Sequence, residues 1–139
     1  MEARLFSHGK AGGFNTIEDL RSRLDKGFRK NGIYFLPKQF DVPSNSLVFF
    51  EMKDTIIGCA VVHEGVREMT EEERREYGDK GGWRKAIMRL DSETIWVWQP
   101  EQYIRLKEVQ IPRFYSGAPK TLTMRHLLNI FRLVAERSK

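Results

Sequence analysis

Three tryptophans, Trp83, Trp96 and Trp98, lie within sixteen residues of one another and beside basic residues. Aromatic faces next to cations suit stacking on a single-stranded or extruded base, and each stack contributes about 1–3 kcal/mol. Trp96 and Trp98 alternate with Ile95 and Val97, so a strand would place both indoles on one face and the aliphatic side chains on the other. If the aliphatic face meets the core, the indoles line a groove, with Trp83 as its rim. Burial in the core is the alternative for each tryptophan.

Groups suited to catalysis or metal binding are scarce. The three histidines, His8, His63 and His126, have no Asp or Cys partner at helical or hairpin spacing. One cysteine and three scattered histidines do not supply the ligands of a zinc site. The cysteine, Cys59, lies in an apolar run, where a buried and unreactive thiol is expected. We therefore expect no catalytic residue, metal or cofactor in this chain, although a carboxylate pair assembled by the fold is the alternative.

The positive charge of the chain is concentrated at its C-terminal end. The formal net charge is +5, and residues 110–139 carry six basic residues against the single acid Glu136, so the rest of the chain balances. A basic end suits an anionic partner such as DNA or RNA. Phosphate contacts position a nucleic acid without specifying its sequence. The expected phosphate contacts are Arg113, Lys120, Arg125 and Arg132. A solvated helix face is the alternative.

The length of 139 residues fits one domain over residues 1–139, large enough for a core without disulfides. No apolar run approaches the length of a membrane span, and the N-terminus does not resemble a signal peptide. A cytoplasmic protein without a membrane partner is expected.

The centre of the fold is predicted at residues 46–65. Two apolar runs, 47–50 and 56–62, flank a short polar hinge and are rich in Val, Ile and Phe, which favour strands. Neither run alternates cleanly, so we expect a hairpin buried on both faces. Gly58 lies inside the second run, where glycine marks a bulge, a bend or the close approach of another backbone.

Shorter elements surround this hairpin. Helices are expected to begin at Thr16, with Asp19 completing a capping box, at Thr70, and near Thr121 or Thr123. The apolar positions of the last helix are Met124, Leu127, Leu128, Phe131 and Val134. Further strands are expected over residues 3–7, 33–36, 84–90, 94–98 and 103–109. This pattern predicts an α+β fold, a small and mostly antiparallel β-barrel of about six strands with flanking helices.

The order of these elements resembles the PUA-like superfamily, and within it the EVE and YTH domains. The local match is Ser46-Leu47-Val48-Phe49-Phe50 followed by Ile56-Ile57-Gly58-Cys59-Ala60-Val61-Val62. The capped helix before it, the tryptophan strand after it and a final helix introduced by Ile111-Pro112 are also similar. The signature that these families carry after the first strand is replaced here by Ser7-His8-Gly9-Lys10-Ala11-Gly12-Gly13.

The resemblance implies a PUA-like barrel that binds nucleic acid and reads a modified or flipped base in an aromatic cage. Carried over, it makes Trp83, Trp96, Trp98, Phe14 and Asn15 the base-binding candidates. Similar domains occur at the N-terminus of McrB-like subunits of modification-dependent restriction systems, which implies a DNA specificity domain fused to, or partnered with, an ATP- or GTP-driven motor and a nuclease.

Three alternatives stay open at this point. The first is an RNA-binding PUA-like domain. The second is a small enzyme acting on a nucleotide or an amide, which a pocket lined by Lys and Glu rather than by indole would favour. The third is a protein-interaction domain that uses the last helix, which a large exposed apolar patch would favour.

Overall fold

The computed structural model describes residues 2–113 and 118–138. Its strands are β1 (Ala3–Ser7), β2 (Ile33–Leu36), β3 (Leu47–Met52), β4 (Thr55–Glu68), β5 (Ala86–Leu90), β6 (Trp96–Val97), β7 (Ile104–Arg105) and β8 (Lys120–Thr121). Its α-helices are α1 (Ile17–Ser22), α2 (Arg29–Asn31), α3 (Glu71–Tyr77) and α4 (Met124–Arg137), and the π-helical segment η2 (Arg23–Phe28) joins α1 to α2. The 3-10 turns within the described residues are η1 (Lys10–Gly12), η3 (Ser92–Thr94), η4 (Pro100–Gln102) and η5 (Leu106–Val109). No helix within the described ranges is long and apolar enough to cross a membrane.

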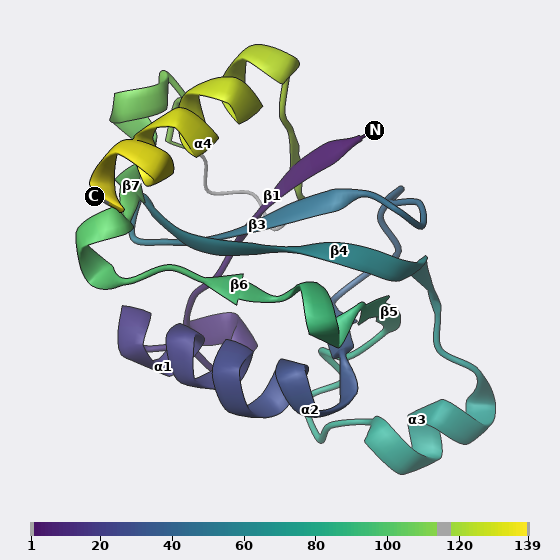
Figure 1. Cartoon of the computed structure of the whole chain (residues 1–139). Helices are drawn as coiled ribbons and strands as arrows, with labels where there is room; N and C mark the ends of the chain where they lie inside the picture. The colour runs from purple at the N-terminus through teal and green to yellow at the C-terminus, as the bar shows by residue number, and fades with distance from the viewer. Residues whose placement is uncertain (1, 114–117, 139) are drawn as a thin grey trace.

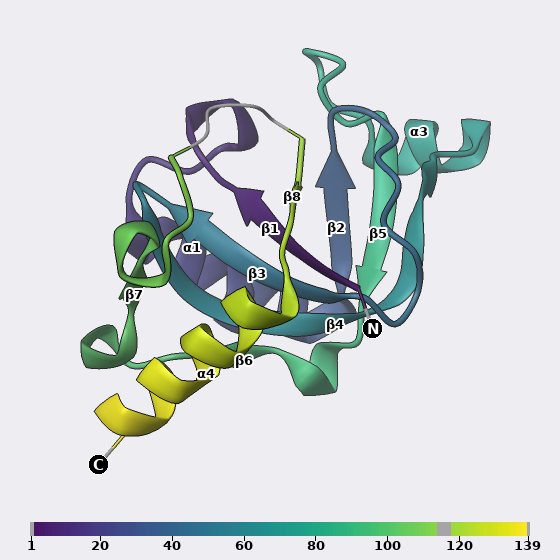
Figure 2. The ribbon, with the colours of Figure 1, turned by 90° about the horizontal axis from the view of Figure 1, so that it is seen from above.

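The strands form one mixed sheet in the order β2-β5-β4-β3-β1-β8, and β6 and β7 also pair with β4 (Figures 1 and 2). The β1–β3 pair is parallel, while every other described pairing is antiparallel. The α+β class and the mostly antiparallel pairing are therefore confirmed.

The predicted barrel of about six strands is wrong, because over the described residues the sheet has eight strands and is open. The long strand β4 pairs with β3 through its first half and with β5 through its second half, and register shifts lie between Val62 and Glu64 and between Glu64 and Arg67. Such bulges bend a strand. In the part of the chain that the structure describes, no ladder joins the end strands β2 and β8. The number of strands exceeds the predicted six because β6, β7 and β8, each only two residues long, are counted as strands.

The predicted central hairpin is confirmed. Met52 pairs with Thr55, so Lys53 and Asp54 form a two-residue turn, and their φ angles of 51° and 64° are those of the left-handed region. Positive φ at both positions is typical of a type I′ turn, whose twist matches that of the strands.

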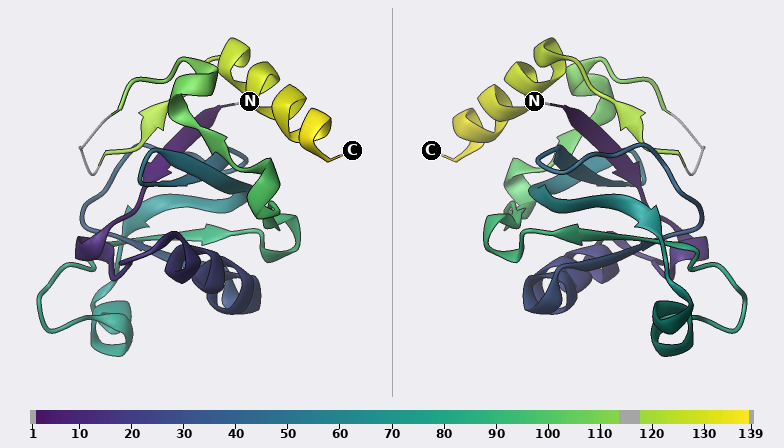
Figure 3. Two further views of the ribbon diagram at one scale, coloured as in Figure 1. Left: turned by 90° about the vertical axis from the view of Figure 1, so that its left-hand side faces the viewer. Right: turned by 90° about the vertical axis from the view of Figure 1, so that its right-hand side faces the viewer.

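The sheet is covered on both faces, which explains why the central strands do not alternate. On one face, α1, η2 and α2 cover a core that includes Phe50 and Ile57. On the other, α4 covers a second core that includes Phe49 and Ile56 (Figures 1 and 3). Neighbouring residues of β3 and β4 therefore enter different cores, and both must be apolar.

Gly58 is required by the close approach of another backbone. A Cβ atom at this position would lie 2.4 Å from the carbonyl oxygen of Trp96, because β6 pairs with β4 here. The expectation drawn from a glycine inside an apolar strand is confirmed.

The predicted helix caps are also confirmed. The side chains of Thr16 and Thr70 each accept a hydrogen bond from the backbone three residues on, and Asp19 and Glu73 complete the capping boxes. The last helix begins after Thr123, whose side chain accepts from the backbone N–H of His126. These caps fix where each helix starts.

Two predicted strands are much shorter than expected. In the stretch 94–98 only Trp96 and Val97 form a strand, after the 3-10 turn η3 in which the Asp91 side chain accepts from the backbone of Glu93. In the stretch 103–109 the strand ends at Arg105, because residues 106–109 form the 3-10 turn η5. In both cases a local turn replaces the ladder that apolar alternation favoured.

Candidate nucleic-acid interface

A pocket of about 590 Å³ opens where β1 ends. Its walls come from the end of β1 with the glycine-rich stretch after it, from the segment η2, from strand β2, and from the loop between α3 and β5. The lining residues are Phe6, Ser7, His8, Gly9, Lys10, Ala11, Gly12, Gly13, Phe14, Arg23, Phe28, Tyr34, Phe35, Leu36, Pro37, Asp79, Trp83 and Arg84. This volume is within the range of sites that hold small ligands.

Phe14 and Trp83, two of the predicted base-binding residues, meet at this pocket although 69 positions separate them in the sequence. A Cβ atom added at Gly12 would lie 3.5 Å from the Phe14 ring and 3.8 Å from the Trp83 ring, so both rings border the same glycine. Phe14 is buried, whereas Trp83 keeps part of its surface exposed. Phe14 thus forms an inner wall and Trp83 an accessible aromatic face.

A hydrogen-bonded pair, His8 and Tyr34, forms the back of the pocket. His8 Nδ1 lies 3.0 Å from the carbonyl oxygen of Glu51, and His8 Nε2 lies 2.5 Å from the Tyr34 hydroxyl. A carbonyl only accepts, so Nδ1 carries the proton and Nε2 accepts from the tyrosine. Burial lowers the pKa of His8 to about 4 and raises that of Tyr34, which keeps both groups neutral at pH 7.

Two arginines border the pocket, each placed over an aromatic ring. The guanidinium carbon of Arg23 lies 5.2 Å from the centroid of the Phe14 ring, and that of Arg84 lies 4.3 Å from the centroid of the Phe35 ring. The backbone N–H of Arg84 also donates to Asp79 Oδ1 at 3.1 Å. With Lys10, these side chains give the pocket three cations and one carboxylate. Its electrostatics therefore favour an anionic ligand.

The other predicted base-binding residues lie outside this pocket. Asn15 is exposed beside it, and its backbone N–H donates to Asp19 Oδ2 at 2.9 Å. Trp96 is 45% exposed on the far face of the sheet, where it stacks on Phe131 of α4 with ring centroids 6.5 Å apart. Neither residue borders the Phe14–Trp83 pocket.

Trp98 is a core residue, and its expected place in a groove is wrong for this structure. It has no exposed surface and packs edge-on against Trp96 with ring centroids 5.9 Å apart. The predicted inward position of Ile95 is confirmed, since Ile95 enters the core under α1 and α2. On the face that bears the two indoles, α4 packs against the sheet, so Trp98 is enclosed in the second core while Trp96 stacks on Phe131 of the helix. The Trp98 Nε1 atom has no hydrogen-bond partner among the described residues.

None of the predicted phosphate contacts lines the pocket. Arg113 forms an ion pair with Asp54 at the β3–β4 turn, where the guanidinium lowers the pKa of that carboxyl. Lys120 lies in β8, and Arg125 and Arg132 lie on α4. Because β8 runs antiparallel to β1, α4 leaves the sheet at the start of β1, while the pocket opens at its end. Figure 2 shows α4 at one end of the sheet, with η1 and the loop after α3 at the other.

Sequence reasoning missed His8, Arg23, Tyr34 and Arg84 as pocket residues. His8 is the first residue of the glycine-rich stretch, which does not match a phosphate-binding motif. The helical pattern places Arg23 on a solvated face. A usable signal was present in the concentration of glycine, histidine and phenylalanine in residues 8–14, since glycines let a chain pass close to a ligand.

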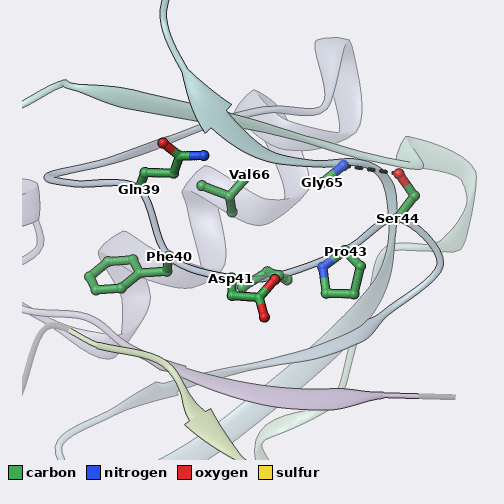
Figure 4. Close-up of a pocket in the computed structure, with 8 residues that line it drawn as sticks. Gln39, Phe40, Asp41, Pro43, Ser44, Gly65 and Val66 are labelled. Atoms are coloured by element: carbon green, nitrogen blue, oxygen red, sulfur yellow. Dashed lines mark hydrogen bonds between the residues drawn. The ribbon is translucent and has the colours of Figure 1, made fainter.

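A separate pocket of about 490 Å³ lies where residues 39–44 pass the end of β4 (Figure 4). The backbone N–H of Gly65 donates to the Ser44 hydroxyl there, at 3.1 Å. Among the described residues, its lining includes Phe40 and Asp41 but no Lys or Arg. This pocket therefore lacks the cations that a nucleic acid requires. No three His, Cys, Asp or Glu side chains gather as metal ligands in residues 2–113 and 118–138.

Comparison with solved structures identifies the fold. ZmASCH from Zymomonas mobilis, solved as a mutant in which one tyrosine is replaced by phenylalanine, matches with a TM-score of 0.58 and 14% identity, over 96% of this chain and 99% of its own. The N-terminal domain of Thermococcus gammatolerans McrB, solved bound to m5C DNA, matches with a TM-score of 0.55 and 9% identity over 100% of both chains. The fold is PUA-like.

A third solved structure with this fold is a YTH domain. It belongs to the MRB1 protein of Zygosaccharomyces rouxii, solved in complex with N6-methyladenosine RNA, and matches with a TM-score of 0.52 and 12% identity, over 96% of this chain and 86% of its own. No protein-family model and no curated protein matches the sequence. The PUA-like resemblance inferred from the central hairpin is therefore confirmed at the level of the fold.

Proposed function

We propose that residues 1–139 form a nucleic-acid-binding module that accepts one extruded or unpaired base in the pocket behind Trp83. The observation that carries the proposal is the arrangement of Trp83 and Phe14 around one glycine, with cations at the same opening. An exposed indole can stack on any base, and nearby arginines can bind the adjoining phosphates. Two proteins of the same fold were solved with methylated DNA or RNA, which supports a modified base as the ligand.

A binding role without catalysis is supported by the hydrogen bonds inside the pocket. His8 uses both ring nitrogens in contacts to Glu51 and Tyr34, and its low pKa makes it a poor base at pH 7. The Ser7 hydroxyl donates to the Glu51 carboxylate at 2.8 Å. These groups hold the wall of the pocket in place.

The more specific role that we propose is DNA specificity in a McrB-like restriction system, with a motor and a nuclease in the same or a partner chain. Its support is the match to the McrB N-terminal domain over the full length of both chains. RNA binding is the alternative, supported by the match to the YTH domain.

A titration with labelled oligonucleotides tests the proposed function. The probes are nine-nucleotide DNA and RNA strands with cytosine, 5-methylcytosine, adenine or N6-methyladenine at the centre, and DNA duplexes with the same base unpaired. We expect salt-sensitive binding that is tighter for at least one methylated base, and loss of this preference in Trp83→Ala. Absence of binding to every probe at low salt contradicts the proposal.

Binding of a partner protein through α4 is a second candidate, favoured by one observation. Met124 and Leu128 are 66% and 69% exposed, although the apolar pattern of the helix predicted that both pack inward, and half-exposed Trp96 stacks on Phe131 of the same helix. The buried side of the helix is formed instead by Leu127, Ile130 and Val134. A Leu128→Glu variant that loses a partner from a pull-down but keeps oligonucleotide binding would support this second function.

A further inference from the structure

The pocket behind Trp83 continues into a hollow on each side. On one side, Phe14 and Arg23 also line a hollow of about 510 Å³ beside α1 and η2. On the other, Asp79 and Arg84 also line a hollow of about 450 Å³ beside α3 and β5. Three ligand-sized depressions therefore follow one another across the surface, with the aromatic pocket in the middle.

An arginine stands at each of the two boundaries. The aliphatic part of Arg23 passes over Gly27, where a Cβ atom would lie 2.9 Å from Arg23 Cδ, and its guanidinium lies over Phe14. The Arg84 guanidinium lies over Phe35, and its Nη1 donates to the carbonyl oxygen of Tyr77 at 3.0 Å. A guanidinium has five N–H donors, so a stack on a ring still leaves donors for a phosphate.

The outer hollows carry an excess of positive charge. Lys26 joins Arg23 in the first hollow, whose described lining includes one acid, Asp19. The Asp19 carboxylate already accepts from the backbone N–H groups of Asn15 and Thr16, at 2.9 and 3.0 Å.

In the second hollow, the four basic residues outnumber the two acids, Glu68 and Asp79. The basic residues are Lys38, Arg74, Arg84 and Lys85. Cationic grooves with an aromatic platform are what single-stranded nucleic acid binds.

We propose that a single strand crosses all three depressions, with its central base in the aromatic pocket and Arg23 and Arg84 each binding one of the two phosphates that flank this nucleotide. The proposal rests on the proposed function, since it needs a base in the pocket. The outer hollows hold the preceding and following nucleotides. The site therefore covers at least three nucleotides, and Arg23 and Arg84 fix the position of the central one.

Replacing single phosphates with uncharged methylphosphonates tests this path. The probe is a nine-nucleotide DNA strand, dT4-X-dT4 with 5-methylcytosine or N6-methyladenine as X, labelled through an uncharged linker and followed by fluorescence anisotropy. Methylphosphonate at either linkage next to X should weaken binding at least fivefold and make the salt slope shallower by about 0.7. The same change three linkages away should weaken binding less than twofold.

Two variants connect these effects to the arginines. Binding by the Arg23→Met variant should no longer weaken when one of the two flanking linkages is a methylphosphonate. Binding by the Arg84→Met variant should no longer weaken when the other flanking linkage is a methylphosphonate. Arg75→Met is the matched control, because Arg75 is exposed on α3 and lines none of the three depressions. Thermal melts verify that each variant is folded, and the chemically altered probes report on the wild-type protein even if a variant unfolds.

Failure of the path and failure of the base pocket give different results. If the wild type binds the methylated probe and methylphosphonates beside X do not weaken this binding, the proposed strand path is wrong, whereas the proposal of a base in the aromatic pocket is not contradicted. The same conclusion follows if Arg23→Met and Arg84→Met behave like Arg75→Met. If the wild type binds no probe, the base pocket itself is contradicted, and the strand path with it.

Discussion

The Nε2 atom of His8 lies 2.5 Å from the hydroxyl oxygen of Tyr34, and this contact joins the loop after β1 to strand β2. The neutral imidazole accepts from the tyrosine while its Nδ1–H donates to the Glu51 carbonyl, so the back wall of the pocket is fixed before any ligand binds. A protonated His8 could not accept this hydrogen bond, which makes the wall sensitive to acid.

We predict that His8 makes the stability of the protein depend on pH. The folded pKa is about 4, against an ordinary value of 6.5, so the unfolded chain binds more protons between these values. The contribution of His8 is therefore complete above about pH 6.5 and is lost as the pH falls towards 4. Urea unfolding should show that the wild type loses roughly 2 kcal/mol more than His8→Gln between pH 7 and pH 5. Equal losses in the two proteins would contradict a neutral imidazole with a lowered pKa at this position.

Trp83 and Trp98 should respond in opposite ways to replacement by alanine. Trp98→Ala removes a fully buried indole and should cost about 3–5 kcal/mol of unfolding free energy. Trp83→Ala should leave the melting temperature nearly unchanged and weaken binding to an unpaired or methylated base by about 1–3 kcal/mol. Melts and titrations on both variants check this. A Trp83→Ala protein that unfolds, or that binds like the wild type, would show that Trp83 is not the stacking platform.

Gly58→Ala should destabilise the fold without touching the pocket. Its methyl group would lie 2.4 Å from the Trp96 carbonyl oxygen. This oxygen cannot move away easily because the backbone of β6 is paired with β4. We expect a loss of about 1–3 kcal/mol. Gly81→Ala is the control, because nothing lies within 4 Å of its Cβ position, and it should change stability by less than about 0.5 kcal/mol. Similar melting temperatures for the two variants would refute the close approach of β6.

We still predict that Arg125 and Arg132 contact phosphates, provided that the nucleic acid is long enough to reach α4. On a thirty-nucleotide single strand, Arg125→Ala or Arg132→Ala should weaken binding to all sequences alike and make the salt slope shallower by about 0.7 each. On the nine-nucleotide probe neither change should matter, because α4 lies at the opposite end of the sheet from the pocket (Figure 2). A change in base preference in either variant would show that α4 reads bases instead.

Much of the fold could be predicted from the sequence because its signals are local. Thr16 and Thr70 cap helices through contacts with residues three positions away, and the two apolar runs around the 52–55 hinge determine the hairpin. The open sheet could not be predicted, since it depends on the bending of β4 and on which strands meet at long range.

The site was only partly predictable, for a related reason. Residue type and neighbouring basic residues indicate Trp83, and the PUA-like resemblance implies Phe14, but only the folded chain brings the two to one pocket. Trp98 was misplaced because alternation shows which residues share a face and not whether another element, here α4, covers that face. Arg23 and Arg84 carry no signal in the sequence beyond their charge, since their role depends on the rings beneath them.

The most direct test of the aromatic pocket is the response of the three tryptophan indole N–H signals in a ¹H–¹⁵N NMR titration. Single Trp→Phe variants identify each signal, and the ligand is the nine-nucleotide strand with the methylated base that binds most tightly. We predict that the Trp83 signal shifts strongly and in proportion to the bound fraction, while the signals of buried Trp98 and of Trp96 on the far face keep their positions. A bound complex in which Trp96 shifts and Trp83 does not would contradict the account.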